Sequence, residues 1–343
     1  MVTAAMATMK DVAERAMVSK ATVSHVLNGT RFVQPDTSER VRTAIQELGY
    51  EMNDTARNLR VRTTCTLAFI VPDLGNPFFP EMATVIQQEA ARAGYDVVIY
   101  STDVPHGSGT ELLQHYLRAI RRKRYDAVIY AETLPVAATS RQRLIDTGTP
   151  VVLIGGTAHP QADRVYIDDY AAARDVMAYL TGKGHRIIAH ITGAPDMASS
   201  DGRLRGYRDG LTAVGITPSP DLEIPGTFLR DGGYTAMGRL LTQPRRPSAV
   251  FAANDLTALG AMLACLDAGV RVPDDIAIVG FDDITFAADT RPALTTVYHG
   301  QREIGHEAVR LALARTRPLT RGEFPEEKQT VIVPHRLVVR DSA

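Results

Sequence analysis

A short segment near the N-terminus carries side chains whose types and spacing suit hydrogen bonding to DNA. Small hydroxyl residues are interspersed there with one lysine and one histidine, and a helix would present them on or near its outer face. Lysine and histidine donate hydrogen bonds to base edges or phosphates in the major groove, and small residues allow close approach. The residues predicted to contact DNA in this segment are Ser19, Lys20, Ala21, Thr22, Ser24, His25 and Asn28.

Two short helices around a tight turn are predicted to position this face. Ala13 is the small residue at which the first helix lets the second come close. Val18, Val23 and Val26 bury the faces between the helices. The hydroxyl of Ser19 can cap the second helix. This spacing is typical of a helix-turn-helix.

The turn of this motif, within residues 9–29, contains an unusual residue. Met17 stands where glycine or asparagine is usual, because the backbone there tends to be left-handed. A methionine in that conformation costs about 1–2 kcal/mol, so we expect a strained or differently shaped turn. A third helix is predicted over residues 36–49, with an apolar stripe and a stop at Gly49. Three such helices could also form a small bundle without a ligand.

Motifs for catalysis or metal binding are missing from the sequence. No G-x-G-x-x-G follows a predicted strand and no G-x-x-x-x-G-K-[ST] is present, so neither usual phosphate-binding loop is predicted. The nine histidines lack metal-ligand spacing, and no Ser-His-Asp or paired-carboxylate arrangement follows a nucleophile elbow. We therefore expect no catalytic residue, no metal site and no cofactor.

Length and composition fit two or three domains with sizeable cores. The chain has 343 residues, 45% of them hydrophobic, and no run approaches the ~20 apolar residues of a membrane span. No signal peptide is predicted, and Cys65 and Cys265 are expected to be reduced, which favours the cytoplasm. Residues 1–63 carry nine Lys or Arg against seven Asp or Glu, a balance of +2, which leaves −3 for the rest. Because this excess of positive charge is so small, DNA binding must come from side-chain placement and from pairing two copies.

Apolar strand-like runs alternate with amphipathic helical stretches from Thr66 onward. This alternation predicts two parallel, doubly wound sheets, which bind ligands at the carboxyl ends of their strands. The predicted strands are Leu67–Val71, Val97–Tyr100, Ala127–Tyr130, Val151–Ile154, Ile187–Ile191, Ala249–Ala252 and Ile276–Val279.

The N-terminal segments resemble the LacI/GalR family of bacterial repressors, closest to its purine- and ribose-repressor branch. The matching stretches are Met6–Ala13, Thr22–Asn28, Arg31–Val33, Leu48–Tyr50 and Ala56–Arg60. The resemblance implies that residues 53–60, too short for a stable isolated helix, form a hinge helix on DNA. Leu59 would wedge into the minor groove, with Arg57 and Arg60 as further DNA-binding residues. Leu59 could alternatively pack as an ordinary linker residue.

The remaining chain resembles the periplasmic sugar-binding-protein fold that the same family uses as its effector domain. Its strongest marks are Asn76–Phe79, Arg203–Tyr207, Asn254–Asp255, Gly280–Asp283 and Pro292–Thr296. The resemblance implies aromatic walls and polar groups that satisfy ligand hydroxyls. The residues that it assigns to the effector site are Asn76, Phe78, Phe79, Arg203, Phe228, Asn254, Asp282 and His299. Asp255 is expected instead to cap the following helix.

Departures from the family pattern bear on the ligand. Gly155 and Gly156 stand where relatives often have aspartate and a large residue, which predicts room for a larger or less polar effector than a pentose. His299 replaces a usual glutamine. The pair Asp168–Asp169 replaces a usual Asp-Asn and adds negative charge near the cleft.

The predicted architecture is an all-α helix-turn-helix domain followed by an α/β effector domain with two doubly wound lobes. The domains are residues 8–52 for DNA binding, 53–63 for the hinge helix and linker, and 64–343 for effector binding and dimerisation. The resemblance implies an N-lobe of residues 64–166 and 296–327 and a C-lobe of residues 167–295 and 328–343.

The sequence therefore predicts a cytoplasmic, homodimeric regulator of transcription, a repressor that binds a palindromic double-stranded operator. A small molecule, a sugar or sugar derivative, would control it allosterically. Two alternatives stay open: a regulator that responds to a purine or nucleoside, and a solute-binding protein of a transport system. The latter would need an export signal and has no use for the first 60 residues.

Overall fold

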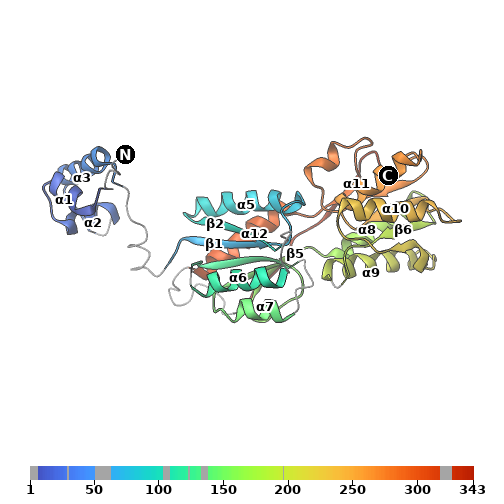
Figure 1. The fold of residues 1–343 in the computed structure, drawn as a ribbon, viewed down its shortest axis with the longest axis horizontal. Helices are drawn as coiled ribbons and strands as arrows, with labels where there is room; N and C mark the ends of the chain where they lie inside the picture. Colours follow the sequence, from blue (N-terminus) through green and yellow to red (C-terminus); the bar gives the residue numbers. More distant parts are fainter. Residues whose placement is uncertain are drawn as a thin grey trace. The chain divides into compact units, whose positions relative to one another are not determined.

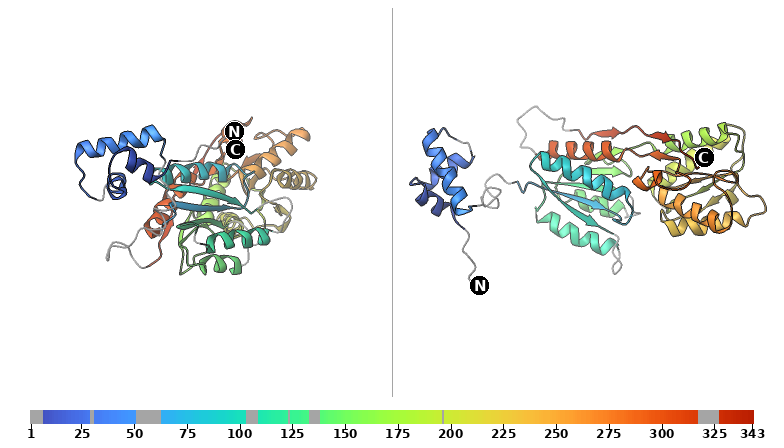
Figure 2. Two further views of the ribbon diagram at one scale, coloured as in Figure 1. Left: turned by 60° about the vertical axis from the view of Figure 1, so that its left-hand side comes forward. Right: turned by 90° about the horizontal axis from the view of Figure 1, so that it is seen from above.

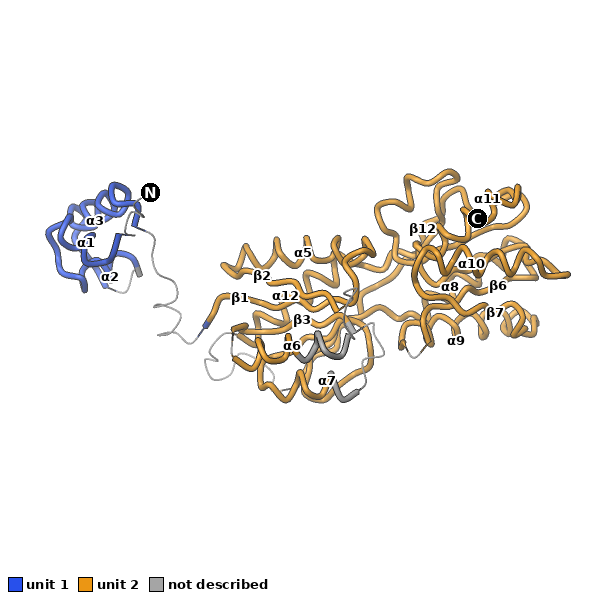
Figure 3. The backbone as a smooth tube through the Cα atoms, in the orientation of Figure 1, with its two compact units in different colours: residues 1–63 blue, residues 64–343 orange. Residues whose placement is uncertain are grey.

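The computed structural model describes residues 7–28, 31–50, 63–102, 109–122, 124–132, 138–195, 197–316 and 327–343. The chain divides into two compact units, residues 1–63 and 64–343 (Figures 1 and 3). Among the described residues, no helix has both the length and the apolar character needed to cross a membrane.

The first unit is the predicted set of three helices. They are α1 (Met9–Arg15), α2 (Lys20–Asn28) and α3 (Pro35–Leu48). Their core is built from small and β-branched side chains, which lets short helices pack closely. Its buried members are Val12, Ala13, Ala16, Val23, Val41 and Ala44. Gly49 ends α3 with a left-handed φ of +56°, as the sequence predicts. The cap of α1 was not predicted: Thr8 and Asp11 bond reciprocally there in a capping box.

The turn between α1 and α2 has the predicted left-handed backbone. Met17 has φ +53°, and 84% of its surface is exposed, so no packing compensates for the conformation. Ser19 caps α2 as predicted, because its Oγ accepts a hydrogen bond from the backbone N of Thr22 at 3.1 Å.

Met17→Gly is expected to stabilise the helix-turn-helix unit by about 1 kcal/mol, because glycine adopts positive φ without a Cβ clash. Hydrogen exchange of the α1 and α2 amides in the full chain should then slow about fivefold. Met17→Ala is the matched control and should give no such protection, since alanine keeps the Cβ. Equal exchange in the glycine variant and the parent would show that the turn is unstrained.

The second unit begins with a six-stranded parallel sheet. Its strands are β1 (Thr66–Val71), β2 (Asp96–Ser101), β3 (Ala127–Glu132), β4 (Val151–Gly155), β5 (Asp163–Tyr166) and β11 (Thr330–Ile332), in the order β11-β5-β4-β3-β1-β2. Alternation along β1 separates its two faces. Leu67 and Phe69 pack with α5 (Phe78–Arg92) and α12 (Gln301–Thr316), whereas Ala68 and Ile70 face α6 (Gly109–Arg121) and α7 (Ala138–Ile145) (Figure 1).

A second parallel sheet forms the C-lobe. Its strands are β6 (Ile188–Ile191), β7 (Glu223–Ile224), β8 (Ala249–Ala252) and β9 (Ala277–Val279), in the order β7-β6-β8-β9. One face packs against α8 (Asp169–Gly182) and α9 (Ala198–Thr212), and the other against α10 (Arg230–Leu241) and α11 (Asp255–Asp267). Figure 2 shows the two sheets of this unit, each with helices on both faces. The prediction of two doubly wound lobes is therefore confirmed.

The last crossing between the lobes lies later in the chain than predicted. The boundary at residue 327 is wrong, because β11 pairs in parallel with β5 and so belongs to the N-lobe sheet. The chain crosses after β11, where β12 (Arg336–Val338) pairs antiparallel with β10 (Thr296–Tyr298). Three residues of edge strand have too little sequence pattern to show which sheet they join.

Candidate functional site

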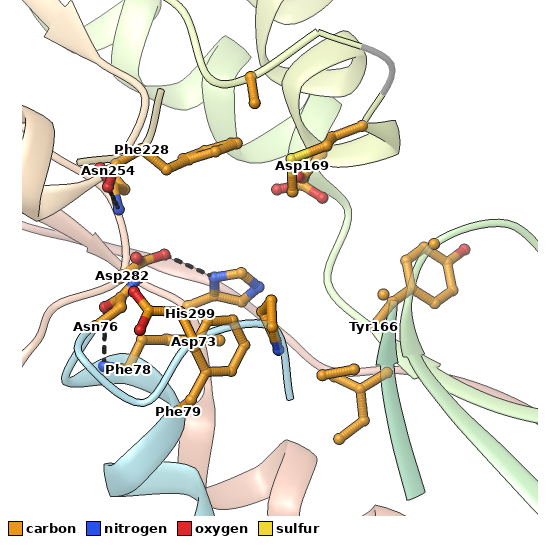
Figure 4. Close-up of a pocket in the computed structure, with 18 of the residues that line it drawn as sticks. Asp73, Asn76, Phe78, Phe79, Tyr166, Asp169, Phe228, Asn254, Asp282 and His299 are labelled. Carbon is orange, nitrogen blue, oxygen red and sulfur yellow. Dashed lines mark hydrogen bonds and ion pairs between the residues drawn. The ribbon is translucent and has the colours of Figure 1, made fainter. Parts of the chain in front are cut away.

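A cavity of about 440 Å³ opens between the two lobes (Figure 4). Its lining comes from the carboxyl ends of several strands of both sheets and from the starts of α5, α9 and α11. Doubly wound sheets bind ligands at this place, and the volume falls in the range of about 300–1,000 Å³ that small-molecule sites have. All eight residues that the sequence assigned to an effector site line this cavity: Asn76, Phe78, Phe79, Arg203, Phe228, Asn254, Asp282 and His299.

Arg203 is fixed in the cavity wall by its neighbours. Its side chain is 3% exposed, its Nε donates to Asp169 Oδ1 at 2.8 Å, and its Nη1 donates to the backbone oxygen of Ala253 at 2.5 Å. The guanidinium carbon lies 3.6 Å from the ring centre of Phe281. The negative charge expected near the cleft is therefore offset, because Asp169 pairs with Arg203 and Asp168 caps α8.

Asp282 and His299 form a polar pair in the cavity wall. His299 Nδ1 lies 3.1 Å from Asp282 Oδ1, and Figure 4 shows this contact beside Asn76. Asp282 has φ +115°, an uncommon conformation for a residue with a side chain. Hydrogen bonds fix this backbone, since its N donates to Val297 O at 2.9 Å and its O accepts from Gln301 Nε2 at 2.5 Å. The strained segment thus keeps the Asp282 carboxylate directed at the cavity.

Aromatic rings supply the apolar part of the wall. Phe78 and Phe79 meet edge to face at 5.1 Å, and Phe78 lies 4.8 Å from the His299 ring. Phe228 approaches from the C-lobe with φ +64°. Gly193 makes room for it, because a Cβ there would lie 2.0 Å from Cζ of Phe228.

Asn254 caps α11, and the prediction that Asp255 does so is wrong. Asn254 Oδ1 accepts from the backbone N of Thr257 at 3.0 Å, while its Nδ2 donates to Phe228 O at 3.0 Å. Asp255 is fully buried and accepts from the Thr296 hydroxyl at 2.5 Å. Burial, followed by the nearby Asp282 carboxylate, raises the pKa of Asp255 well above its usual value.

Several residues of the lining were not assigned from the sequence. Some are polar and follow strands or begin helices, a placement that could have identified them. The others are apolar and have no signal apart from the fold. Among the missed residues are Asp73, Thr102, Tyr166, Asp169, Met197, Ser199, Thr227 and Leu229.

The predicted DNA-contacting face lies on α2 of the first unit. Ser19, Lys20 and Ala21 are exposed, and Thr22, Ser24 and His25 are half-buried. The hydroxyls of Ser19 and Thr22 lie 2.9 Å apart, so both take part in the helix cap. This geometry suits a helix that enters the major groove with its first turns. The side chain of Asn28, and Arg57, Leu59 and Arg60 of the predicted hinge helix, lie outside the described residues.

Both parts of the chain match known families. Residues 8–53 match "Bacterial regulatory proteins, lacI family", and residues 177–343 match "Periplasmic binding protein-like domain". The chain is 33% identical over 343 residues to the HTH-type transcriptional repressor PurR of Pasteurella multocida (strain Pm70), with 98% of each chain covered. It is 34% identical to the PurR of Edwardsiella ictaluri (strain 93-146), covering 98% of this chain and 97% of the relative.

Solved structures with similar folds include two complexes. One is the lac repressor dimer bound to operator and the anti-inducer ONPF, with a TM-score of 0.87, 26% identity, and 98% and 99% of the two chains covered. The other is the transcriptional regulator CelR–cellobiose complex, with a TM-score of 0.74, 32% identity, and 98% and 100% covered. With a helix-turn-helix unit and a two-lobed unit that encloses a cavity, the chain belongs to the lacI family of bacterial regulatory proteins and is a DNA-binding regulator of transcription.

Proposed function

We propose that this protein is a homodimeric repressor that binds a palindromic operator and is controlled by a carbohydrate in the cavity between its lobes. The observation that carries the proposal is the convergence of Arg203, Asn254 and Asp282 with three phenylalanines around that cavity. Fixed polar groups beside flat aromatic faces suit the hydroxyls and C–H surfaces of a sugar.

Control of DNA binding follows from the two-lobed design. A ligand that contacts both lobes stabilises one lobe arrangement over others, and a change at a dimer interface would reposition two DNA-binding units. The similarity to the lac repressor dimer on its operator and to CelR with cellobiose supports this reading. Residues 1–63 carry a positive excess of only +2, so two paired copies would supply the affinity.

A purine or nucleoside effector is the second candidate. It is favoured by the identity of 33% to the PurR repressor over nearly the whole chain. A planar base would stack on Phe78 or Phe228 and bond to Asn254 or Asp282 through its edge. A transport role is not favoured, because the first 63 residues form a separate helix-turn-helix unit. The named relatives are transcription regulators, and we propose that this chain likewise acts without catalysis, in the cytoplasm.

A thermal-shift screen tests the choice of effector. A ligand that binds only the folded chain raises its melting temperature. Sugars should raise it, whereas purines and nucleosides should leave it unchanged. If purines or nucleosides alone raise the melting temperature, the effector is of that second class and not a carbohydrate. Gel-shift assays with a palindromic operator in the same samples test DNA binding separately.

His25→Ala is expected to change which operator variants bind best, because the imidazole would donate to a guanine or adenine acceptor in the major groove. Loss of one base contact lowers discrimination at that position by about 1–3 kcal/mol. Competition gel shifts with single-base operator variants measure this ranking. Arg42→Ala on α3 is a control expected to keep the parent ranking. If His25→Ala weakens all operators equally, His25 contacts phosphate or supports the fold instead.

A further inference from the structure

The cavity has two chemically different ends. Figure 4 shows Asn76, Asp282 and His299 together on one side, and Tyr166 across the open space from them. We name the first group the aspartate end. The second, made of Ile154, Gly155, Gly156 and Tyr166, is the tyrosine end. The hydroxyl of Tyr166 points away from the aspartate end in this view, so the phenol offers mainly its ring to a ligand.

The tyrosine end is a built feature of the N-lobe. Gly155 ends β4 and Gly156 follows it, with φ of +73° and +57°, a backbone that favours glycine. Arg164 holds this turn, since its Nε donates to Gly155 O at 2.9 Å and its Nη2 donates to Gly156 O. The same guanidinium lies 3.7 Å from the ring centre of Tyr166. The arginine therefore fixes both the side-chain-free turn and the aromatic ring beside it.

The charges of the cavity disfavour an anion. Among the described lining residues, the carboxylates are Asp73, Asp169 and Asp282, and the only Lys or Arg is Arg203. Arg203 is already paired with Asp169. Asp73 and Asp282 therefore face the cavity without a lysine or arginine partner among the described residues. A phosphate or carboxylate on the ligand would be repelled there, whereas hydroxyl groups could donate to both carboxylates.

We propose that the effector is an uncharged two-ring glycoside of disaccharide size. This proposal rests on the proposed function, because it names the ligand class of the same cavity. One ring binds its hydroxyls at the aspartate end, and the second lies against Tyr166 over the double-glycine turn. A single ring held at the aspartate end would leave the Tyr166 ring covered only by water, and a second ring removes that apolar surface from water.

Calorimetric titration of the full chain tests this assignment. The probes are glucose, galactose, mannose and xylose; the disaccharides cellobiose, maltose, lactose, trehalose, sucrose and xylobiose; and glucose 6-phosphate and trehalose 6-phosphate. At least one disaccharide should bind tenfold or more tightly than its component monosaccharides, and the phosphates should not bind. The proposal is overturned if no disaccharide binds, if a monosaccharide binds equally well, or if a phosphate binds more tightly.

Variants of Tyr166 locate the second ring. Tyr166→Ala should lower the affinity for the preferred disaccharide by about tenfold and change the affinity for monosaccharides less than twofold. Tyr166→Phe keeps the aromatic ring and should leave both affinities as in the parent. Tyr234→Ala, on α10 outside the cavity lining, is the matched control. An equal loss for both ligand sizes in Tyr166→Ala would overturn the second subsite.

Operator binding, measured in parallel, tests the proposed repressor function separately from the proposed two-ring effector. Selective operator binding with a response only to a single-ring or anionic ligand would refute the two-ring effector alone. Failure to bind any operator selectively would refute the proposed function.

Discussion

Arg203→Ala is expected to abolish the response of operator binding to effector at concentrations that saturate the parent protein. The side chain is 3% exposed and bonds to Asp169 and to the backbone oxygen of Ala253 at the cavity wall. Loss of the hydrogen bonds that this charged side chain donates to the ligand costs about 1.5–3 kcal/mol, which corresponds to a loss of effector affinity of roughly 10- to 150-fold. Fluorescence anisotropy of a labelled operator, titrated with the responding sugar, measures the effect.

Controls for this variant come from the same helix and the same cavity. Arg208→Ala, also on α9, removes a surface pair with Glu223 and should keep the response. Asp282→Ala should lose the response to effector, as Arg203→Ala does, but it leaves the ion pair between Arg203 and Asp169 intact. DNA binding itself should survive in all three variants, because the residues that we propose bind the operator lie in the separate unit 1–63. Unaltered effector sensitivity in the Arg203 and Asp282 variants would place the effector site elsewhere.

The second large effect is a loss of stability in acid that depends on His190. This side chain is fully buried in β6, with its Nδ1 2.8 Å from Phe251 O and its ring stacked on Tyr207 and Phe251. Burial lowers the pKa of His190 from 6.5 to about 4. Between these values the unfolded chain binds a proton that the folded chain does not. The free energy of unfolding therefore falls as pH decreases, by about 2 kcal/mol from pH 7 to pH 5.

His190→Phe should remove this component of the pH dependence, because phenylalanine preserves the stacked ring and does not titrate. Urea unfolding followed by tyrosine fluorescence suits the test, since eleven of the twelve tyrosines lie in residues 64–343. His115→Phe, at an exposed position of α6, is the control and should leave the dependence as in the parent. A pH profile that is identical in His190→Phe and the parent would assign the acid sensitivity to other groups.

The sequence predicted the elements whose patterns are strong and local. The continuous apolar run of β1, the cap of α2 at Ser19 and the stop of α3 at Gly49 depend on neighbours a few positions away, and the structure has them as predicted. The short strands β5, β7 and β11 were missed, because two to four residues carry too little periodicity to distinguish strand from loop.

Predictions that depend on distant contacts were less complete. Asn254 and Asp255 are both good helix caps, and the choice between them is made by Thr296, which bonds to Asp255 from a strand 41 residues away. The pairing of Asp169 with Arg203 spans 34 residues, so only the excess of negative charge could be predicted from the sequence. Similarly, Gly193 has no local motif and is explained only by the ring of Phe228 beside it.

Selection of DNA by the full chain, in the presence and absence of the sugar panel, tests the central claim most directly. Randomised duplexes retained by the protein should converge on a sequence with two-fold symmetry, and one uncharged disaccharide should change their retention at least tenfold. The same disaccharide should leave retention by the Arg203→Ala variant unchanged. Retained DNA without two-fold symmetry, or retention that no small molecule alters, would contradict the account.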